Sequence, residues 1–361
     1  MAWDAIRALI PKHWLRREPS SSSMIIETVF GSKLYVVGMD KPARIEGVQW
    51  DGGVIDESSD QKPGVFDRSV RPALTHRKGW CWRIGVPKRY GAGAREFKHA
   101  YDLGMRSDAG IRSFTWPSWD ILPQEEIAIL RSQLDTKDFN EQVGGNFVDA
   151  GGQAYYEFSD ANVRPVTYDS HAPIYVGSDF NVDPMAWVLG HKTNHGLEIF
   201  DELWLRNTNT KATLDYLWQK YGETHKGGWF FTGDASSRSR KTSAASSDYV
   251  QIKNDKRFDA KVRYDKSNPA RKDRLAAVNL LCHNAADQRR LHVDPRCAHL
   301  IDDLKNRVID PATGEPVAAE PGLAHDSGHA TDALGYLIYK YFPVVVDRGQ
   351  GLRLVSVDNN G

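Results

Sequence analysis

The stretch at residues 171–192 constrains the fold of this chain more than any other feature. It reads HAPIYVGSDFNVDPMAWVLGHK, in which a break containing proline and aspartate separates two apolar runs. The pattern predicts a pair of strands, and Asp179 ends the first of them. Aspartate is depleted in strands, and burying an unpaired carboxylate is costly. Asp179 is therefore either an ordinary turn residue or part of a functional site.

The region that begins with this stretch has a regular order of predicted elements. The runs PIYVGSDF, MAWVLGHK and LEIFDELWL predict three consecutive strands with short turns. An amphipathic helix, TNTKATLDYLWQKYGETH, and a fourth strand, GWFFTGDAS, follow, and AKVRYD is a candidate fifth strand. The predicted helices after the fourth strand are NPARKDRLAAVNLLCHNA, RCAHLIDDLKNRVI and HDSGHATDALGYLIYKYF.

Three aspartates occupy special places in this order. Asp179 ends the first strand, Asp234 ends the fourth, and Asp332 lies in the first turns of the last helix. If the first and fourth strands are neighbours, two of these carboxylates meet, and a helix packed over that edge brings the third. Clustered carboxylates repel one another and need a compensating charge, which Mg²⁺ or Mn²⁺ supplies. Two such ions roughly 3.5–4 Å apart can hold both oxygens of a phosphodiester displacement in line.

Each of these aspartates taken alone would be read as a turn former or a helix cap. The three together, in these topological positions, favour a metal site. Nearby polar residues have simpler interpretations. For Asp183 an Asx-type turn before the following proline is favoured, with an accessory metal residue as the alternative. Asp201 and Glu202 face opposite sides of a strand, so we expect one to point toward the cluster and the other to solvent. His325 and His329 share one helical face, where solvent exposure or a cap contact is favoured over a role beside the metals.

Composition sets broader limits on the chain. Its 361 residues allow one large domain or two ordinary ones, and 40% hydrophobic with 26% charged residues is typical of globular proteins. The formal net charge is zero, so the overall balance gives no argument for nucleic acid. The three cysteines form no CxxC pair, which excludes a disulfide framework and a zinc signature. No apolar run is long enough to span a membrane.

The local charge balance differs from the global one. Residues 238–274 contain 12 lysines and arginines against five aspartates. Such a patch beside a metal site would bind the phosphate backbone of DNA, and salt would weaken that binding. Arg238, Arg240 and Lys241 lie in the serine-rich stretch SSRSRKTSAASSDY, which we interpret as a loop that becomes ordered on DNA. A solvated charged surface is the alternative.

Several motifs resemble one family in both order and spacing. YVGSDFNVDPMAWVLG, EIFDELWLRNTNT, FTGDASS and HATDALGYLIY resemble the nuclease domain of the large terminase subunit of tailed bacteriophages. The resemblance covers nearly all of residues 171–342. It implies an RNase H-like fold that cuts concatemeric viral double-stranded DNA, with Asp179, Asp234 and Asp332 as the acidic triad that holds two Mg²⁺ or Mn²⁺ ions.

The first part of the chain resembles the packaging ATPase of the same family. WDGGVIDESSD resembles a Walker B strand, which implies that Asp56 binds the Mg²⁺ of ATP and that Glu57 orients the attacking water. WRIGVPKRYGAGAREF resembles the coupling motif that follows, and GSKLYVVGMDKPARIEG the strand and turn that precede. A lone VIDES would instead be read as a strand that ends in a surface turn, but the neighbouring motifs favour the ATPase.

One element of such an ATPase is missing from the sequence. Nothing matches G-x-x-x-x-G-K-[ST], so the loop and the lysine that hold the phosphates are absent. The chain resembles a large terminase without its N-terminal portion, and ATP would act as a cofactor only if that portion were supplied. We therefore expect the strands within VVGM, GGVID and WRIGV to have an uncovered edge or face.

These observations predict an α/β protein with a C-terminal RNase H-like nuclease domain preceded by a partial P-loop (ASCE-type) ATPase domain. The expected segments are the partial ATPase at 1–115, a linker or subdomain at 116–170, the nuclease at 171–343 and a flexible tail at 344–361. The expected activity is two-metal cleavage of DNA with little sequence preference, because no base-reading element is visible. The alternatives are a non-cutting, DNA-binding assembly subunit and another RNase H-like nuclease of the resolvase or transposase type.

The resemblance also implies partners and a location. The partners would be double-stranded DNA, the small terminase subunit and the portal protein, with a ring oligomer on the portal and no membrane. The location would be the cytoplasm of the infected bacterial host, and the protein would not be a stable part of the mature virion.

Overall fold

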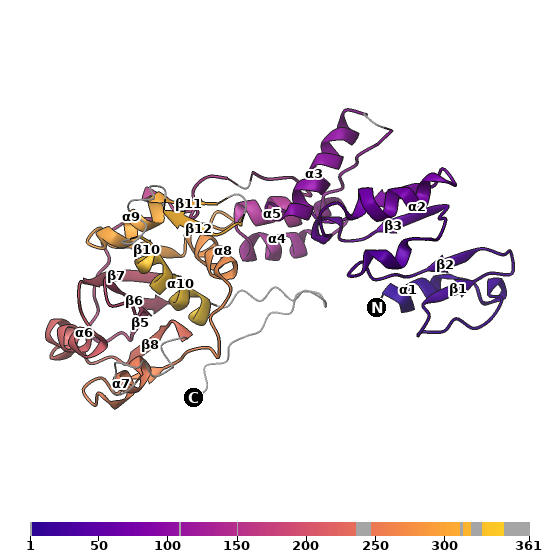
Figure 1. Ribbon diagram of the computed structural model, residues 1–361. Coiled ribbons are helices and arrows are strands. Elements are labelled where there is room, and N and C mark those ends of the chain that lie inside the picture. Colours follow the sequence, from indigo (N-terminus) through magenta and orange to yellow (C-terminus); the bar gives the residue numbers. More distant parts are fainter. Residues whose placement is uncertain are drawn as a thin grey trace. The chain divides into compact units, whose positions relative to one another are not determined.

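The chain forms two compact units. The computed structural model describes residues 2–107, 110–149, 151–235, 247–310, 313–318 and 327–342. The first unit comprises Met1–Val86 and Gly91–Ser113, and the second comprises Pro87–Tyr90 and Phe114–Gly361 (Figure 1). The functional division at residues 115, 170 and 343 stays a prediction. No helix among the described residues is both long and apolar enough to cross a lipid bilayer.

The first unit is built from short elements. Its helices are α1 (Ala2–Leu9), α2 (Arg71–Thr75) and α3 (Ala92–Met105), and its strands are β1 (Ile25–Glu27), β2 (Lys33–Tyr35), β3 (Gly52–Ile55) and β4 (Trp80–Arg83). Strands β1 and β2 pair in antiparallel fashion, whereas β3 and β4 are parallel. Each of these two sheets has two strands in the described part of the chain.

The β3–β4 sheet has one covered face. Ile55 packs into a small apolar core with residues of the following helical segment, including Leu74. On the opposite face Val54, Trp80 and Trp82 are 54%, 55% and 66% exposed. Parallel sheets are usually covered on both faces, because crossover helices lie over them. The expectation of an uncovered face is thus confirmed for β3 and β4 among the described residues. The strand expected within VVGM does not form, because β2 ends at Tyr35.

The second unit contains a six-stranded mixed sheet and most of the helices. The strands are β5 (Ile174–Asp179), β6 (Met185–Thr193), β7 (Gly196–Leu205), β8 (Trp229–Gly233), β9 (Lys261–Val262) and β10 (Leu291–Val293), with β11 (Arg307–Ile309) and β12 (Pro316–Ala318) as a separate pair. The helices are α4 (Gln124–Gln133), α5 (Thr136–Gln142), α6 (Thr210–Leu217), α7 (Asp248–Asn254), α8 (Arg271–Cys282), α9 (Ala298–Asn306) and α10 (His329–Tyr341).

The strand order in this sheet is β10-β7-β6-β5-β8-β9. Strands β5, β6 and β7 are consecutive and antiparallel, and β8 lies parallel beside β5. The predicted neighbourhood of the first and fourth strands is therefore confirmed. Two details differ from the sequence prediction: β10 was not expected, because three residues carry too little pattern, and the end of RCAHLIDDLKNRVI is strand β11 instead of helix.

The sheet separates two hydrophobic cores. Along β5, Ile174 and Val176 point into the core that packs against α6 and α7. Their neighbours Tyr175 and Gly177 face the other core, where α8 and α10 cover the sheet (Figure 1). This alternation follows from the two-residue period of a strand. It gives β5 one face for each core.

Helix α10 approaches β5 very closely at Gly177. A Cβ atom added there would lie 2.4 Å from the carbonyl oxygen of Ala333 and 2.8 Å from the Cβ of Leu337. Both atoms belong to the rigid part of α10, so neither can move aside alone. Glycine at this position lets the helix lie directly on the strand.

Gly177→Ala should therefore destabilise the second unit by about 2 kcal/mol or more, since α10 must shift or β5 must bend. Chemical denaturation followed by tryptophan fluorescence measures the change. Gly151→Ala is the matched control, because a Cβ atom there meets nothing within 4 Å. Equal stability of the two variants would contradict the close approach.

Candidate functional site

Two of the predicted acids are placed by strand β5 and its neighbour β8. Along β5, Asp179 shares a face with Gly177, the face that α10 covers. In the parallel β5–β8 pair Ser178 lies opposite Gly233, so Asp179 and Asp234 are the next residues of the two strands. The carboxyl ends of neighbouring parallel strands meet at the same edge of a sheet, which brings these two aspartates together.

The third acid comes from the first turn of α10. This helix begins after Gly328, whose φ of 94° is left-handed. His329, Asp332 and Tyr336 follow at helical spacing and line the same cleft. Other residues of the helix, such as Ala333 and Leu337, face the core instead. The amphipathic pattern of α10 thus turns one polar stripe toward the ends of β5 and β8.

These elements enclose a cleft of about 510 Å³. It is lined by residues at and after the ends of β5 and β8, by residues of α10, and by residues of α8 and the loop before it. These residues are Asp179, Phe180, Asn181, Asp234, Asn268, Pro269, Arg271, Arg274, His329, Asp332 and Tyr336. The structure therefore brings the three predicted aspartates into one cleft.

Each of the three carboxylates accepts a hydrogen bond from a different neighbour. The pairs are His329 Nδ1 with Asp179 Oδ2 at 2.7 Å, Asn268 Nδ2 with Asp234 Oδ1 at 2.7 Å, and Arg274 Nη1 with Asp332 Oδ1 at 2.8 Å. The donors come from α10, from the loop before α8 and from α8 itself. These contacts partly offset the mutual repulsion of the three acids.

Asp179 shows the electrostatic cost of bringing the three carboxylates together. Burial raises the pKa of this carboxyl group, and the nearby charges of Asp332 and Asp234 raise it further. The hydrogen bond and charge of His329 oppose these effects without cancelling them. A carboxylate whose negative charge is disfavoured in this way would be stabilised by a cation.

The donor chemistry of the cleft fits a hard divalent cation, because carboxylate oxygens are the ligands that Mg²⁺ and Mn²⁺ prefer. Their positions are not those of a finished metal site: within the described residues, no three side chains of His, Cys, Asp or Glu are grouped as metal ligands. A bound ion would compete with His329, Asn268 and Arg274 for carboxylate oxygens.

Two further acids next to the predicted site have structural roles. Asp201 is buried, accepts a hydrogen bond from the Tyr221 hydroxyl at 2.6 Å and pairs with Lys220. Glu202 accepts the backbone N–H groups of His299 and Leu300, both at 2.9 Å, at the start of α9. Neither lines the cleft or points to solvent, so the sequence interpretation of this pair was wrong.

The sequence interpretation of His329 was also wrong, and it did not single out the cations of the cleft. His329 is not a solvent or cap residue but contacts Asp179 directly, and His325 lies outside the described residues. Arg271 and Arg274 were counted in the basic segment without being singled out. Their spacing, one helical turn apart at the start of a predicted helix, was the signal that could have separated them.

The other predicted site residues lie elsewhere. Arg238, Arg240 and Lys241 fall outside the described residues, so their DNA-binding role stays a prediction. Asp56 and Glu57 are exposed and directly follow β3 in the first unit. Asp56 Oδ1 accepts the backbone N–H of Glu57 at 3.0 Å, and Glu57 has a left-handed φ of 49°. This strand-end turn suits a Walker B motif and an ordinary surface turn equally.

Comparison with known proteins shows relatives at low identity. No family model matches the chain. The large terminase subunits of Thermus phage G20c and Thermus virus P23-45 are each 26% identical to it over 125 residues. This match covers 30% of the chain, and it spans only 25% of the length of these curated relatives.

Solved structures cover much more of the chain. The large terminase of a thermophilic bacteriophage is 15% identical, with a TM-score of 0.51, and the match covers 91% of this chain and 79% of that one. The same phage protein in complex with ADP is 14% identical, with a TM-score of 0.51, and the match covers 94% of this chain and 84% of that one. The predicted resemblance to large terminase subunits is thereby confirmed. The α/β fold class is confirmed as well. The assignment of the first unit to a partial ATPase and of the second to an RNase H-like nuclease stays a prediction.

Asp303 of α9 holds the start of α10, since its Oδ1 accepts the Gly328 N–H at 2.8 Å. Burial raises the pKa of this carboxyl group to about 6. The Asp303 carboxyl group therefore binds a proton more tightly in the folded protein than in the unfolded chain. The free energy of unfolding should fall as the pH rises from about 4 to 6. Asp303→Asn should remove this slope and stabilise the protein at pH 7 by up to roughly 3 kcal/mol.

Thermal denaturation between pH 4 and 7 measures this effect. Asp302→Asn is the control, because the adjacent Asp302 is exposed. An unchanged pH slope in Asp303→Asn would show that this buried carboxyl group does not titrate as we infer.

Proposed function

We propose that this chain is a large terminase polypeptide that acts as a metal-dependent endonuclease on double-stranded DNA. The observation that carries the proposal is the convergence of Asp179, Asp234 and Asp332 from two neighbouring strand ends and one helix on a single open cleft. The family resemblance supports the same activity, because the chain shares the fold of large terminases over most of its length.

The three aspartates would hold one or two Mg²⁺ or Mn²⁺ ions. Such ions would polarise the phosphodiester and would lower the pKa of a bound water. The three carboxylates and the raised pKa of Asp179 fit this role. Carboxylate oxygens suit Mg²⁺ and Mn²⁺ better than zinc, which favours histidine and cysteine ligands.

The chain's own side chains prepare the cleft for this chemistry. His329 orients the carboxylate of Asp179, and Asn268 orients that of Asp234. Arg274 of α8 holds the carboxylate of Asp332. Because the donors come from separate elements, the carboxylates are fixed relative to one another before a substrate enters. This preorganisation lowers the cost of gathering like charges around a phosphate.

The wider biological role follows the family resemblance. The chain would cut concatemeric viral DNA with little sequence preference during genome packaging, in the cytoplasm of an infected bacterium and not as a stable part of the mature virion. Its partners would be the DNA, a small terminase subunit and a portal protein, on which it would form a ring. The segment with Arg238, Arg240 and Lys241 would add contacts to the DNA backbone.

The full chain should nick supercoiled plasmid DNA in Mg²⁺ or Mn²⁺ and be inactive in chelator. Asp179→Asn should lower the rate roughly a hundredfold or more, since it removes a charged oxygen ligand while keeping the shape of the side chain. Gel electrophoresis of the plasmid measures the rate, and circular dichroism checks the fold.

Asp183→Asn is the matched control for this test. Asp183 lies in the loop after β5, does not line the cleft and pairs with Arg206 at 3.4 Å. It should keep full activity. If the native chain binds DNA but never cuts it in either metal, the non-cutting assembly subunit becomes the better description.

The first unit should not act as an ATPase by itself. Asp56 and Glu57 can place a metal ion and a water, but most of the catalysis of phosphoryl transfer comes from groups that hold the phosphates. The sequence has no match to the loop and the lysine that would hold them. We expect the chain alone to release phosphate from ATP at the background rate, with or without DNA. DNA-stimulated hydrolysis that persists in Glu57→Gln would contradict both the Walker B assignment and this argument.

A further inference from the structure

The first turn of α8 forms one wall of the cleft. Asn268, Pro269, Arg271 and Arg274 all line it. The residue before the helix is Ala270, whose side chain cannot accept hydrogen bonds from the N–H groups of the first turn. The positive end of the helix dipole is therefore not satisfied by a capping side chain.

The charges in this turn have the wrong sign for their position. Arg271, Lys272 and Arg274 stand in the first four residues of α8, and Asp273 is the single acid among them. Cations are disfavoured at a helix N-terminus, where anions are stabilised. The sequence thus places positive charge where the backbone is already positive. An anion bound at this wall would relieve both effects.

Arg274 gives independent support for an anion site at this wall. Its side chain is 7% exposed, with one ion pair to Asp332 and the ring of Tyr336 stacked at 4.1 Å from the guanidinium carbon. Its buried Nε has no hydrogen-bond partner among the described residues. A guanidinium group has five N–H donors, and a buried one is usually well satisfied. A single carboxylate leaves this corner of the cleft short of acceptors.

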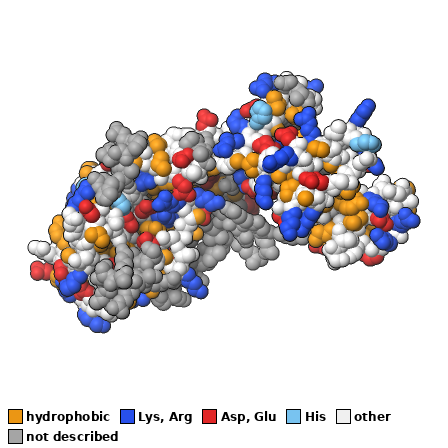
Figure 2. Space-filling view, in the orientation of Figure 1, with side chains coloured by type: hydrophobic (Ala, Val, Ile, Leu, Met, Phe, Trp, Pro, Cys, Tyr) orange, Lys and Arg blue, Asp and Glu red, His pale blue; other side chains and the backbone are white. Residues whose placement is uncertain are grey.

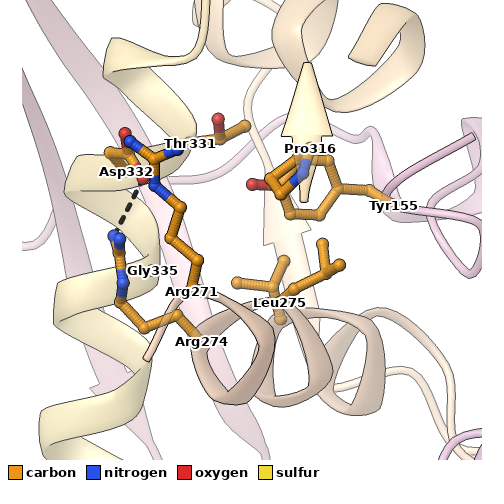
Figure 3. A pocket seen from close by; sticks show the side chains of 9 residues that line it. Tyr155, Arg271, Arg274, Leu275, Pro316, Thr331, Asp332 and Gly335 are labelled. Atoms are coloured by element: carbon orange, nitrogen blue, oxygen red, sulfur yellow. Dashed lines mark hydrogen bonds and ion pairs between the residues drawn. The ribbon is translucent and has the colours of Figure 1, made fainter. Parts of the chain in front are cut away.

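Arg271 is the accessible cation of the same wall. It lines the cleft and also the small cavity beside it, and both it and Arg274 extend from α8 toward Asp332 on α10 (Figure 3). Its nearest acidic partner is Glu315, with Nη1 and Oε2 3.8 Å apart, which is too long for a hydrogen bond. Figure 2 shows acidic and basic side chains mixed over one face of the molecule.

We propose that Arg271 and the uncapped first turn of α8 bind a backbone phosphate of the nucleic acid, directly beside the three carboxylates. Arg274 is a positioning residue in this arrangement, because it keeps Asp332 against the same wall. The inference rests on the proposed nuclease function and adds the residues that would place the phosphodiester. A guanidinium group suits this role, since its fork matches two phosphate oxygens.

The test compares two adjacent cations in the full chain. Arg271→Gln and Lys272→Gln remove the same charge one residue apart, but only Arg271 lines the cleft. Binding of a short DNA duplex is measured in chelator, by fluorescence anisotropy over a range of salt concentrations. Arg271→Gln should weaken binding roughly threefold to tenfold and reduce the salt slope by about one, whereas Lys272→Gln should change both much less.

A substitution at Glu315 provides a second test, in which DNA binding should change in the opposite direction. Glu315→Gln should strengthen DNA binding, because it removes the carboxylate that competes with DNA for Arg271. The gain should disappear when Arg271→Gln is also present. Equal effects of Arg271→Gln and Lys272→Gln, or a gain from Glu315→Gln that survives in the double variant, would overturn the proposal.

These readouts separate this inference from the proposed function. If the native chain binds DNA through Arg271 but never cuts it, the phosphate site stands and the nuclease proposal fails. If the native chain cuts DNA and Arg271→Gln binds and cuts as Lys272→Gln does, the nuclease proposal stands and the phosphate site fails.

Discussion

The contact between α10 and β5 at Gly177 is the constraint on which the site depends. Because residue 177 has no side chain, the helix lies within van der Waals distance of the strand backbone. That distance is what lets His329 reach Asp179, two residues further along the same face of β5. A larger residue would move the helix outward and carry His329 and Asp332 away together. Packing in the core thus sets the geometry of charged groups at its edge.

The cleft also shows how like charges can be gathered before any ion or substrate is bound. Each carboxylate has a donor from a separate element, so no single loop has to organise the whole group. Burial still raises the pKa of Asp179 despite its histidine partner. The site therefore retains a free-energy cost that a cation would lower, and this cost is a driving force for binding one.

The two units differ in how fully they cover their sheets. In the second unit a separate apolar core lies on each face of the six-stranded sheet, with α8 and α10 on one side and α6 and α7 on the other. In the first unit the parallel pair β3 and β4 has a core on one face among the described residues, and two tryptophans are exposed on the other. Exposed apolar surface of this kind usually marks a contact surface. Asp56 and Glu57 directly follow β3 in this incompletely covered sheet.

The sequence alone determined the order of strands and helices in the second unit and which acids would end them. Apolar runs with a two-residue period identify strands, and an aspartate directly after such a run is a visible departure. Asp179 and Asp234 could be singled out on this ground, and Asp332 by its place in the first turns of the last helix. The resemblance to large terminases supplied the fold. Short elements such as β10 were not predicted, because three residues cannot establish a hydrophobic period.

Only the tertiary structure decided which polar side chains serve the cleft. His329 reaches Asp179 because α10 lies flat on β5, whereas Asp201 and Glu202 serve a tyrosine and a helix start elsewhere. These are contacts between residues 20 to 150 positions apart in the chain. The pattern along a strand or helix shows which side a residue faces. Which residues it contacts on that side depends on how the elements pack. The sequence therefore identified the acids, and packing selected their partners.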